Sequence, residues 1–363
     1  MMNHTLGIIG FGGMASGYHY ATTCREDVPF TTTAVFDLRE SQRALAKEKG
    51  LAVFDNLRDF LASHLFEMVL VATPNNMHCP MACAAMEAGY HVMVEKPVAM
   101  SSAEVETMIA TSKRTGKLFT VHHNRRWDRD FLIVKQAFAD GLVGKPFTIE
   151  SRIHGNLRDD GQGGLHGWRA FEDHGGGMLL DWGVHMLDQL LFLIDEPLVS
   201  VSANILSHRG RPVDDYSKVI LTFASGLCAQ MEVTTFTPLR LPRWYIVGEE
   251  GALTMDAIDA PHAVVRHVDN SHFLRGNVFA YSMTEVSERP DESFIVDKST
   301  TFEYPSADRM PPQDWASLYK NLGGVLDGTE ELVVKPEQVL RCFRVIEAAF
   351  TSAREHRTIL FNE

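Results

Sequence analysis

The chain has 363 residues, of which 45% are hydrophobic and 22% charged, and its formal net charge is −13 at pH 7. This length exceeds what one hydrophobic core usually serves, so we expect a globular protein of two domains. The acidic balance argues against a nucleic-acid partner, which would require a basic face, and no apolar run is long enough to cross a membrane. The sequence opens without a signal-peptide pattern, and its five cysteines lack a disulfide or zinc spacing, so we expect a cytoplasmic protein.

The first third of the chain alternates apolar runs with helical patterns. Strands are expected over residues 6–9, 32–36, 68–72, 91–94 and 118–121. Helices are expected over 40–49, over 77–88 and from Ser101, which has capping-box spacing with Glu104. Continuous apolar strands are typical of parallel sheets that are covered on both faces. This alternation predicts an α/β Rossmann domain with a doubly wound parallel sheet over residues 1–123.

A glycine-rich turn, Gly10 to Ala15, follows the first predicted strand and fits the pattern G-x-G-x-x-G/A. Its glycines permit a tight turn and close approach to a pyrophosphate, and its last small residue lets the next helix pack on the strand. Asp37 ends the second strand, where an acid can bind ribose hydroxyls, whereas Arg39 could pair with a 2′-phosphate. We therefore expect NAD as the cofactor, with NADP as the alternative. The cofactor-binding residues predicted from these patterns are Gly10, Phe11, Gly12, Gly13, Met14, Asp37 and Arg39.

After about residue 123 strand patterns dominate. Strands are expected over residues 146–153, 199–206, 216–223, 227–234, 244–247 and 252–255. Helices are expected over 184–194 and 336–356, and the second of these can pack back on the first domain. Residues 256–301 are polar and show little periodicity. We expect 124–363 to form an α+β substrate-binding and oligomerisation domain with a large, mostly antiparallel open sheet. Because the open face of such a sheet usually needs a partner, we expect a homodimer or homotetramer.

Asp181 and His185 are four residues apart and follow the three glycines 175–177. The spacing puts a carboxylate and an imidazole on one helical face, and the glycines would let the backbone approach a ligand. Oxidation of a secondary alcohol needs a base and a group that stabilises charge on the oxygen. An imidazole has an ordinary pKa of about 6.5, whereas Lys96 would need its pKa lowered by about three units from roughly 10.4. We therefore expect His185 to accept the proton and Lys96 to act as a fixed cation.

Asp181 would then anchor a substrate hydroxyl or hold the imidazole in position. The alternative is a capping aspartate followed by a buried histidine. Asp188 could complete a set of metal ligands with Asp181 and His185, but no further cluster supports one, and we expect no metal.

Several motifs resemble those of the Gfo/Idh/MocA oxidoreductase family, which includes glucose-fructose oxidoreductase and inositol dehydrogenase. They are residues 94–97 (VEKP), 72–75 (ATPN) with His78, and the stretch 175–185 (GGGMLLDWGVH). The resemblance implies that Lys96, Asp181 and His185 line a substrate site beside the nicotinamide. It adds to the expected cofactor-binding residues Thr73, Pro74, Asn75, His78, Glu95, Lys96, Trp168 and Arg169. The expected substrate-binding residues are Asn124, Arg125, Asp181, Trp182 and His185.

Two of these segments have other interpretations. The stretch 122–127 could be a basic loop between domains, and Trp182 is bulkier than the residue that the family pattern would place beside the aspartate.

The sequence therefore predicts an NAD(P)-dependent dehydrogenase or reductase that acts on a sugar, polyol or inositol. Two alternatives remain open: a glycosidase that uses bound NAD for a transient oxidation, and a dinucleotide-binding regulator without catalysis. Retention of Lys96, Asp181 and His185 together argues against the regulator, since a sensor needs no acid–base set.

Overall fold

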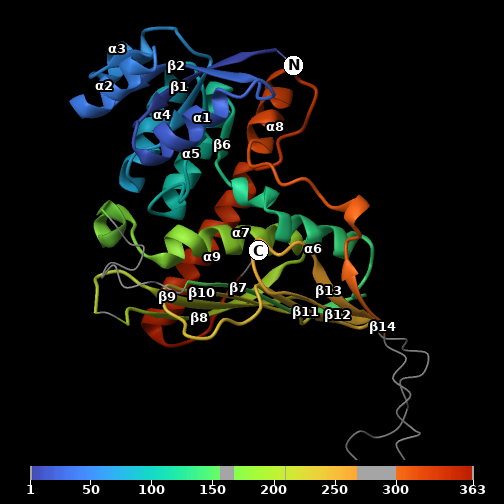
Figure 1. Cartoon of the computed structure of the whole chain (residues 1–363). Coiled ribbons are helices and arrows are strands. Elements are labelled where there is room, and N and C mark those ends of the chain that lie inside the picture. The colour runs from blue at the N-terminus through green and yellow to red at the C-terminus, as the bar shows by residue number, and fades with distance from the viewer. Residues whose placement is uncertain (1, 156–166, 209, 268–299, 362–363) are drawn as a thin grey trace, which may run out of the picture.

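The protein is built on two sheets, seen in a computed structural model that describes residues 2–155, 167–208, 210–267 and 300–361 (Figure 1). The first sheet contains β1 (His4–Ile9), β2 (Phe30–Phe36), β3 (Ala52–Phe54), β4 (Met68–Val71), β5 (His91–Val94) and β6 (Phe119–Val121). All its strands are parallel, in the order β3-β2-β1-β4-β5-β6, which is the strand order of a dinucleotide-binding fold. The predicted Rossmann sheet is confirmed, with β3 as a strand that sequence patterns missed.

Helical segments connect these strands. They are η1 (Met14–His19, a π-helix), α1 (Tyr20–Thr23), α2 (Glu40–Glu48), α3 (Leu57–Leu61), η2 (Asn75–Met77), α4 (His78–Glu87) and α5 (Ser102–Thr115). The capping box before α5 is only half formed. The Ser101 hydroxyl accepts a hydrogen bond from the Glu104 N–H at 3.3 Å, but the Glu104 carboxylate accepts from the Met100 N–H, one residue earlier than a capping box requires.

The second sheet has nine strands in the order β14-β13-β12-β11-β7-β10-β9-β8-β15. They are β7 (Pro146–His154), β8 (Leu198–Leu206), β9 (Tyr216–Phe223), β10 (Cys228–Thr234), β11 (Trp244–Gly248), β12 (Gly251–Met255), β13 (Ala263–His267), β14 (Thr300–Tyr304) and β15 (Ile359–Leu360). Only β7 and β10 run parallel among these described strands, so the predicted mostly antiparallel sheet is confirmed. Within the weakly periodic stretch 256–301, β13 and the start of β14 form strands, and 268–299 lie outside the described residues.

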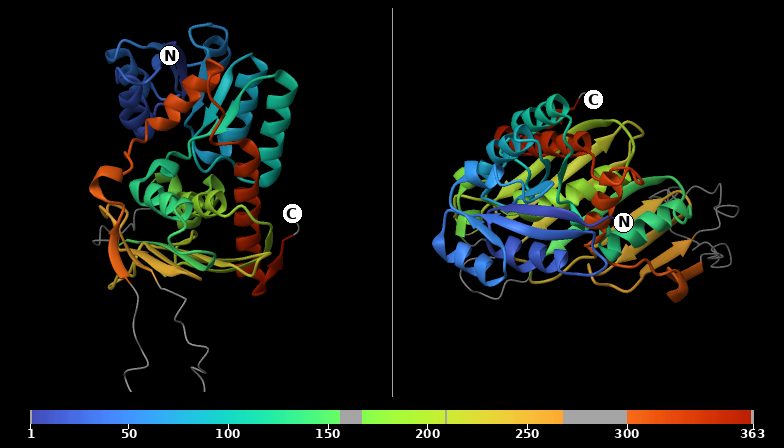
Figure 2. Two further views of the ribbon diagram at one scale, coloured as in Figure 1. Left: turned by 90° about the vertical axis from the view of Figure 1, so that its right-hand side faces the viewer. Right: turned by 90° about the horizontal axis from the view of Figure 1, so that it is seen from above.

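Helices cover one face of the second sheet. The helical segments after β6 are η3 (Asn124–Trp127), α6 (Arg129–Ala139), η4 (Gly167–Ala170), η5 (Glu172–His174), η6 (Leu179–Gly183), α7 (Val184–Leu193), η9 (Ala307–Arg309), α8 (Ser317–Leu326) and α9 (Pro336–Glu355). In Figures 1 and 2, α6 and α7 lie between the two sheets, α9 runs from beside α5 down to the nine-stranded sheet, and no described helix lies on the opposite face of that sheet. None of the described helices combines the length and apolar character needed to cross a bilayer.

The late part of the chain returns to the first sheet. Helix α8 lies beside the N-terminal strands (Figure 1), where Lys320 pairs with Asp27 at 2.7 Å and Gly323 leaves no room for a Cβ next to Pro29. Helix α9 packs along α5, and its Glu347 accepts hydrogen bonds from the backbone N–H and hydroxyl of Ser102. The domain boundary at residue 123 remains a prediction.

Candidate active site

A cavity of about 680 Å³ opens at the carboxyl edge of the parallel sheet, a volume in the range of small-molecule sites. Its wall contains nearly all of the predicted cofactor-binding residues: Gly10, Gly12, Gly13, Met14, Asp37, Arg39, Thr73, Pro74, Asn75, His78, Glu95, Lys96, Trp168 and Arg169. Phe11 is the exception, because its side chain is fully buried and its backbone N–H donates to Asp37 at 2.8 Å.

The turn after β1 is shaped for a phosphate group. Gly10 has φ +88°, and a Cβ there would lie 2.7 Å from the Ala72 carbonyl oxygen, so only glycine is tolerated. The π-helix η1 starts at Met14 and continues into α1. Backbone N–H groups at the start of such a helix favour an anion, and the turn therefore fits the pyrophosphate of a dinucleotide.

Asp37 and Arg39 form an ion pair at the β2 end of the cavity. The guanidinium Nε and Nη2 lie 3.0 and 2.9 Å from the two carboxylate oxygens, which also accept the N–H groups of Phe11 and Arg39. Burial acts to raise the pKa of the Asp37 carboxyl, but these hydrogen bonds outweigh it and lower the pKa below its ordinary value. Asp37 is thus an ionised acceptor, and the Arg39 side chain remains 59% exposed.

Lys96 and Asp181 come from different domains and meet at the β5 end of the cavity. The Lys96 ammonium donates to the Asp181 carboxylate at 2.8 Å and to the Asp181 backbone carbonyl at 2.9 Å, and the Arg169 guanidinium lies 3.5 Å from the same carboxylate. Burial acts to raise the pKa of Asp181, but Lys96 and Arg169 hold it below its ordinary value. Two roles were expected for Asp181: to anchor a substrate hydroxyl or to hold the His185 imidazole in position. Its carboxylate binds the Lys96 ammonium and not the imidazole.

His185 lies in the first turn of α7, one turn beyond Asp181, and is 5% exposed. Its Nδ1 has no hydrogen-bond partner among the described residues. Burial, followed by the charges of Lys96, His123 and Arg125, lowers the pKa of His185 well below 6.5. The unperturbed pKa assumed from the sequence is therefore wrong. The imidazole is neutral at pH 7 and can accept a proton.

The three glycines before η6 approach protein atoms closely, and the expectation that they let the backbone approach a ligand stays a prediction. A Cβ at Gly176 would lie 2.2 Å from the Arg169 carbonyl oxygen, and one at Gly177 would lie 2.1 Å from an Asp214 carboxylate oxygen. The Gly175 carbonyl accepts a hydrogen bond from the Asn75 amide at 3.0 Å. These contacts fix the segment that carries Asp181 against the cavity wall.

His78 also joins two parts of the wall, because its ring nitrogens lie 2.9 Å from the carbonyl oxygens of Thr73 and Pro97. Both nitrogens are occupied by backbone contacts, so His78 shapes the cavity through its neighbours.

Arg125 is held between two indole rings beside the site. Its guanidinium lies 4.5 Å from the Trp182 ring centroid and 4.7 Å from that of Trp315, and it pairs with Asp128 at 3.3 Å. One face of the Trp182 ring therefore packs against Arg125. Asn124, which was also predicted to bind substrate, is buried. Sequence analysis missed Trp315, which is separated from Arg125 by 190 positions and lies in a segment without periodicity.

A phosphate-binding turn, an acid after β2, and a lysine with a neutral imidazole at the same sheet edge define a dinucleotide-dependent oxidoreductase. The chain belongs to the Gfo/Idh/MocA oxidoreductase family. Residues 4–123 match the family model described as an oxidoreductase family with an NAD-binding Rossmann fold, and residues 131–254 match the GFO/IDH/MocA C-terminal domain. The protein is thus an NAD-binding oxidoreductase.

Individual relatives agree with this assignment. The crystal structure of an NAD-binding protein from Listeria innocua is 37% identical, with a TM-score of 0.83 over 99% of this chain and 97% of that one. The scyllo-inositol 2-dehydrogenase (NADP(+)) of Bacillus subtilis is 28% identical over 85% of this chain and 82% of its own. The D-glucoside 3-dehydrogenase of Escherichia coli is 35% identical over 54% of this chain and 56% of its own.

Proposed function

We propose that this oxidoreductase transfers a hydride between its nicotinamide cofactor and a secondary alcohol or ketone carbon of a sugar, polyol or inositol. The observation that carries the proposal is the Lys96–Asp181 pair beside the neutral, buried His185. The relatives from Bacillus subtilis and Escherichia coli are named for an inositol and a glucoside, which supports this substrate class.

The bound cofactor supplies the hydride acceptor when an alcohol is oxidised. In that direction the imidazole of His185 takes the hydroxyl proton, and the Lys96 ammonium donates a hydrogen bond to the same oxygen as negative charge develops on it. Asp181 fixes the ammonium through two contacts and offers its remaining acceptor capacity to a substrate hydroxyl. Asn124, Arg125 and Trp182 are the further groups that we propose bind the substrate.

The experiment that tests this function measures nicotinamide reduction by absorbance. It uses NAD and NADP separately, each with a panel of sugars, polyols and inositols. Turnover of one class of hydroxyl-rich compound is the expected result. Cleavage of a glycoside without net reduction would replace the proposal with hydrolysis by transient oxidation. Cofactor binding without turnover of any compound in the panel would replace it with a regulatory role.

We expect the protein to bind NAD more tightly than NADP, and we expect Arg39 to determine the size of that difference. Replacing Arg39 with alanine leaves Asp37 without its cation, so the carboxylate repels a 2′-phosphate more strongly and still accepts from ribose hydroxyls. The affinity for NADP is expected to fall by about tenfold or more relative to NAD, the effect of one charged hydrogen bond. Separate fluorescence titrations with the two dinucleotides measure the ratio.

Arg43→Ala is the matched control, because Arg43 donates to the backbone carbonyls of Asp37 and Leu38, and its loss leaves the carboxylate paired with Arg39. Equal weakening of both dinucleotides by Arg39→Ala would show that the arginine does not select between them.

We also propose that the protein is a cytoplasmic homodimer or homotetramer, with the open face of the nine-stranded sheet as the interface. Partly exposed apolar side chains on this face, including Tyr245 and Val264, support an interface. Light scattering is expected to give at least twice the monomer mass of 40.6 kDa, and a monomer at micromolar concentration would refute the proposal.

A further inference from the structure

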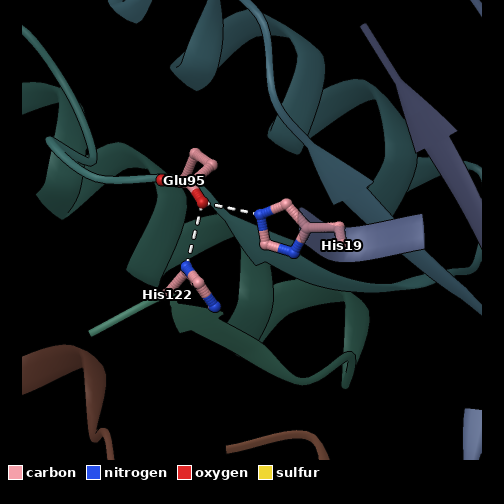
Figure 3. A group of neighbouring side chains, drawn as sticks. All are labelled: His19, Glu95 and His122. Carbon is pink, nitrogen blue, oxygen red and sulfur yellow. Dashed lines mark hydrogen bonds and ion pairs between the residues drawn. The ribbon is translucent and has the colours of Figure 1, made fainter. Parts of the chain in front are cut away.

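A buried cluster of polar side chains lies at the β5 end of the cavity and is not used in the chemistry above. It joins His19 at the end of η1, Glu95 after β5 and His122 after β6 (Figure 3). The His19 Nε2 lies 2.6 Å from a Glu95 carboxylate oxygen, and the His122 Nδ1 lies 2.9 Å from the same oxygen. All three side chains are at most 9% exposed.

The Tyr319 hydroxyl determines the proton position on His19. It lies 2.6 Å from the His19 Nδ1, and donation of its O–H to that nitrogen leaves the imidazole proton on Nε2, facing Glu95. Burial lowers the pKa of His19 to about 4, so the ring is neutral at pH 7. His19 is therefore a neutral donor to the carboxylate.

His122 donates to the same carboxylate oxygen. Its Nδ1–H faces Glu95, and its Nε2 is buried without a partner among the described residues.

The other Glu95 oxygen accepts the Lys96 backbone N–H at 2.9 Å. Burial acts to raise the pKa of Glu95, but the two histidines hold it well below its ordinary value. Glu95 is therefore a buried, ionised carboxylate.

The distances between these side chains fit hydrogen bonds better than they fit the coordination of a metal ion. Two ligands that bind zinc tetrahedrally at about 2.0–2.1 Å are roughly 3.3 Å apart. The separations of 2.6 and 2.9 Å between the imidazole nitrogens and the carboxylate oxygen are those of charge-assisted hydrogen bonds. The cluster is an ionised carboxylate held by hydrogen bonds.

This anion lies at the nicotinamide end of the cofactor cavity. Glu95 lines the cavity together with Lys96, Trp168 and Arg169. Its strand, β5, is three positions from β2 in the sheet order, which is about 14 Å at the usual strand spacing. Because Asp37 after β2 is placed to bind the adenosine ribose, the cavity wall at Glu95 faces the other end of the dinucleotide.

We propose that the buried Glu95 carboxylate, held by His19, His122 and the Lys96 backbone, makes the site favour the oxidised cofactor, whose nicotinamide ring is a cation, over the neutral reduced form. The inference requires dinucleotide binding but not the substrate proposed above. Its failure would leave the proposed sugar, polyol or inositol substrate untouched.

The experiment compares dissociation constants for NAD and NADH, each titrated separately into the purified full-length protein. Glu95→Gln removes the charge and keeps the side chain's size. It is expected to weaken NAD relative to NADH by about three- to thirtyfold, as Coulomb's law gives for unit charges roughly 10 Å apart at intermediate dielectric constants. Tyr319→Phe is the matched control, because it removes a hydroxyl from the cluster without changing its charge, and the NAD-to-NADH ratio is expected to stay within about twofold of wild type.

An unchanged ratio in Glu95→Gln, with or without equal weakening of both forms, would overturn the proposal, and so would the same shift in Tyr319→Phe. If Glu95→Gln does not fold, the triple variant His19→Phe, Glu95→Met and His122→Phe removes the charge together with its two imidazole donors, a replacement that costs little when partners are lost together. It must show the same shift in ratio.

Discussion

Replacing Lys96 with alanine is expected to lower turnover by about 10²- to 10³-fold or more while NAD still binds, the usual cost of losing one donor to a developing oxyanion. The ammonium is fixed by two oxygens of Asp181, at 2.8 and 2.9 Å, so it is oriented before substrate arrives. Its loss removes the hydrogen bond to the reacting oxygen and also leaves Asp181 with Arg169, at 3.5 Å, as its one paired cation among the described residues.

The measurement for Lys96→Ala is kcat/KM with the compound identified in the panel, alongside a fluorescence titration with NAD. Lys113→Ala serves as the control, because that side chain is 71% exposed and its one ion pair with a described residue is to Glu337, at 3.7 Å. Losses of the same size in turnover and in cofactor affinity would show that Lys96 supports the cavity and takes no part in the chemistry.

His185→Asn is expected to lower the rate of alcohol oxidation by about 10²- to 10⁴-fold, the range for a positioned general base. The pH dependence of the wild-type enzyme provides a second readout. Only the neutral imidazole accepts a proton, and the pKa of His185 lies well below 6.5. The oxidation rate should therefore stay level as the pH falls through 6.5, and should decrease only at lower pH, when the ring becomes protonated.

The same substitution at an exposed histidine is the control for His185→Asn. His64 has φ +54°, a conformation that asparagine tolerates, and it lies at the surface. A variant at position 185 that kept both the rate and the pH profile of wild type would exclude the imidazole as the base, and the acceptor would then have to be sought elsewhere in the cavity.

Local sequence patterns predicted those site residues that lie in a turn directly after a strand. Gly10 and Asp37 each follow a strand that its apolar run reveals, and parallel strands bring their carboxyl ends to one edge. The three-residue strand β3 was missed because it is too short for a recognisable pattern and is only half-buried.

Contacts between distant segments could not be read from spacing. The Lys96–Asp181 pair spans 85 positions and the His19–Tyr319 hydrogen bond spans 300. The sequence placed Asp181 at the site through its spacing from His185 and Lys96 through its motif, but it gives no signal that these two side chains pair, and none for the second contact. The pKa of His185 depends on burial and on three neighbouring cations or rings from other segments, so the ordinary value was the only one available from sequence.

Helix α8 packs against the first sheet, and this determines whether the Rossmann domain can be separated from the rest of the chain. Tyr319 closes the His19 hydrogen bond, Lys320 pairs with Asp27, and Asp327 contacts His4, so three supports of the Rossmann domain come from beyond residue 315. A fragment ending at residue 123 would expose the surface that α8 covers and leave the buried His19 ring without its phenol. The two sheets are separate in architecture, but we expect these contacts to make cooperative unfolding and resistance to proteolysis properties of the intact chain.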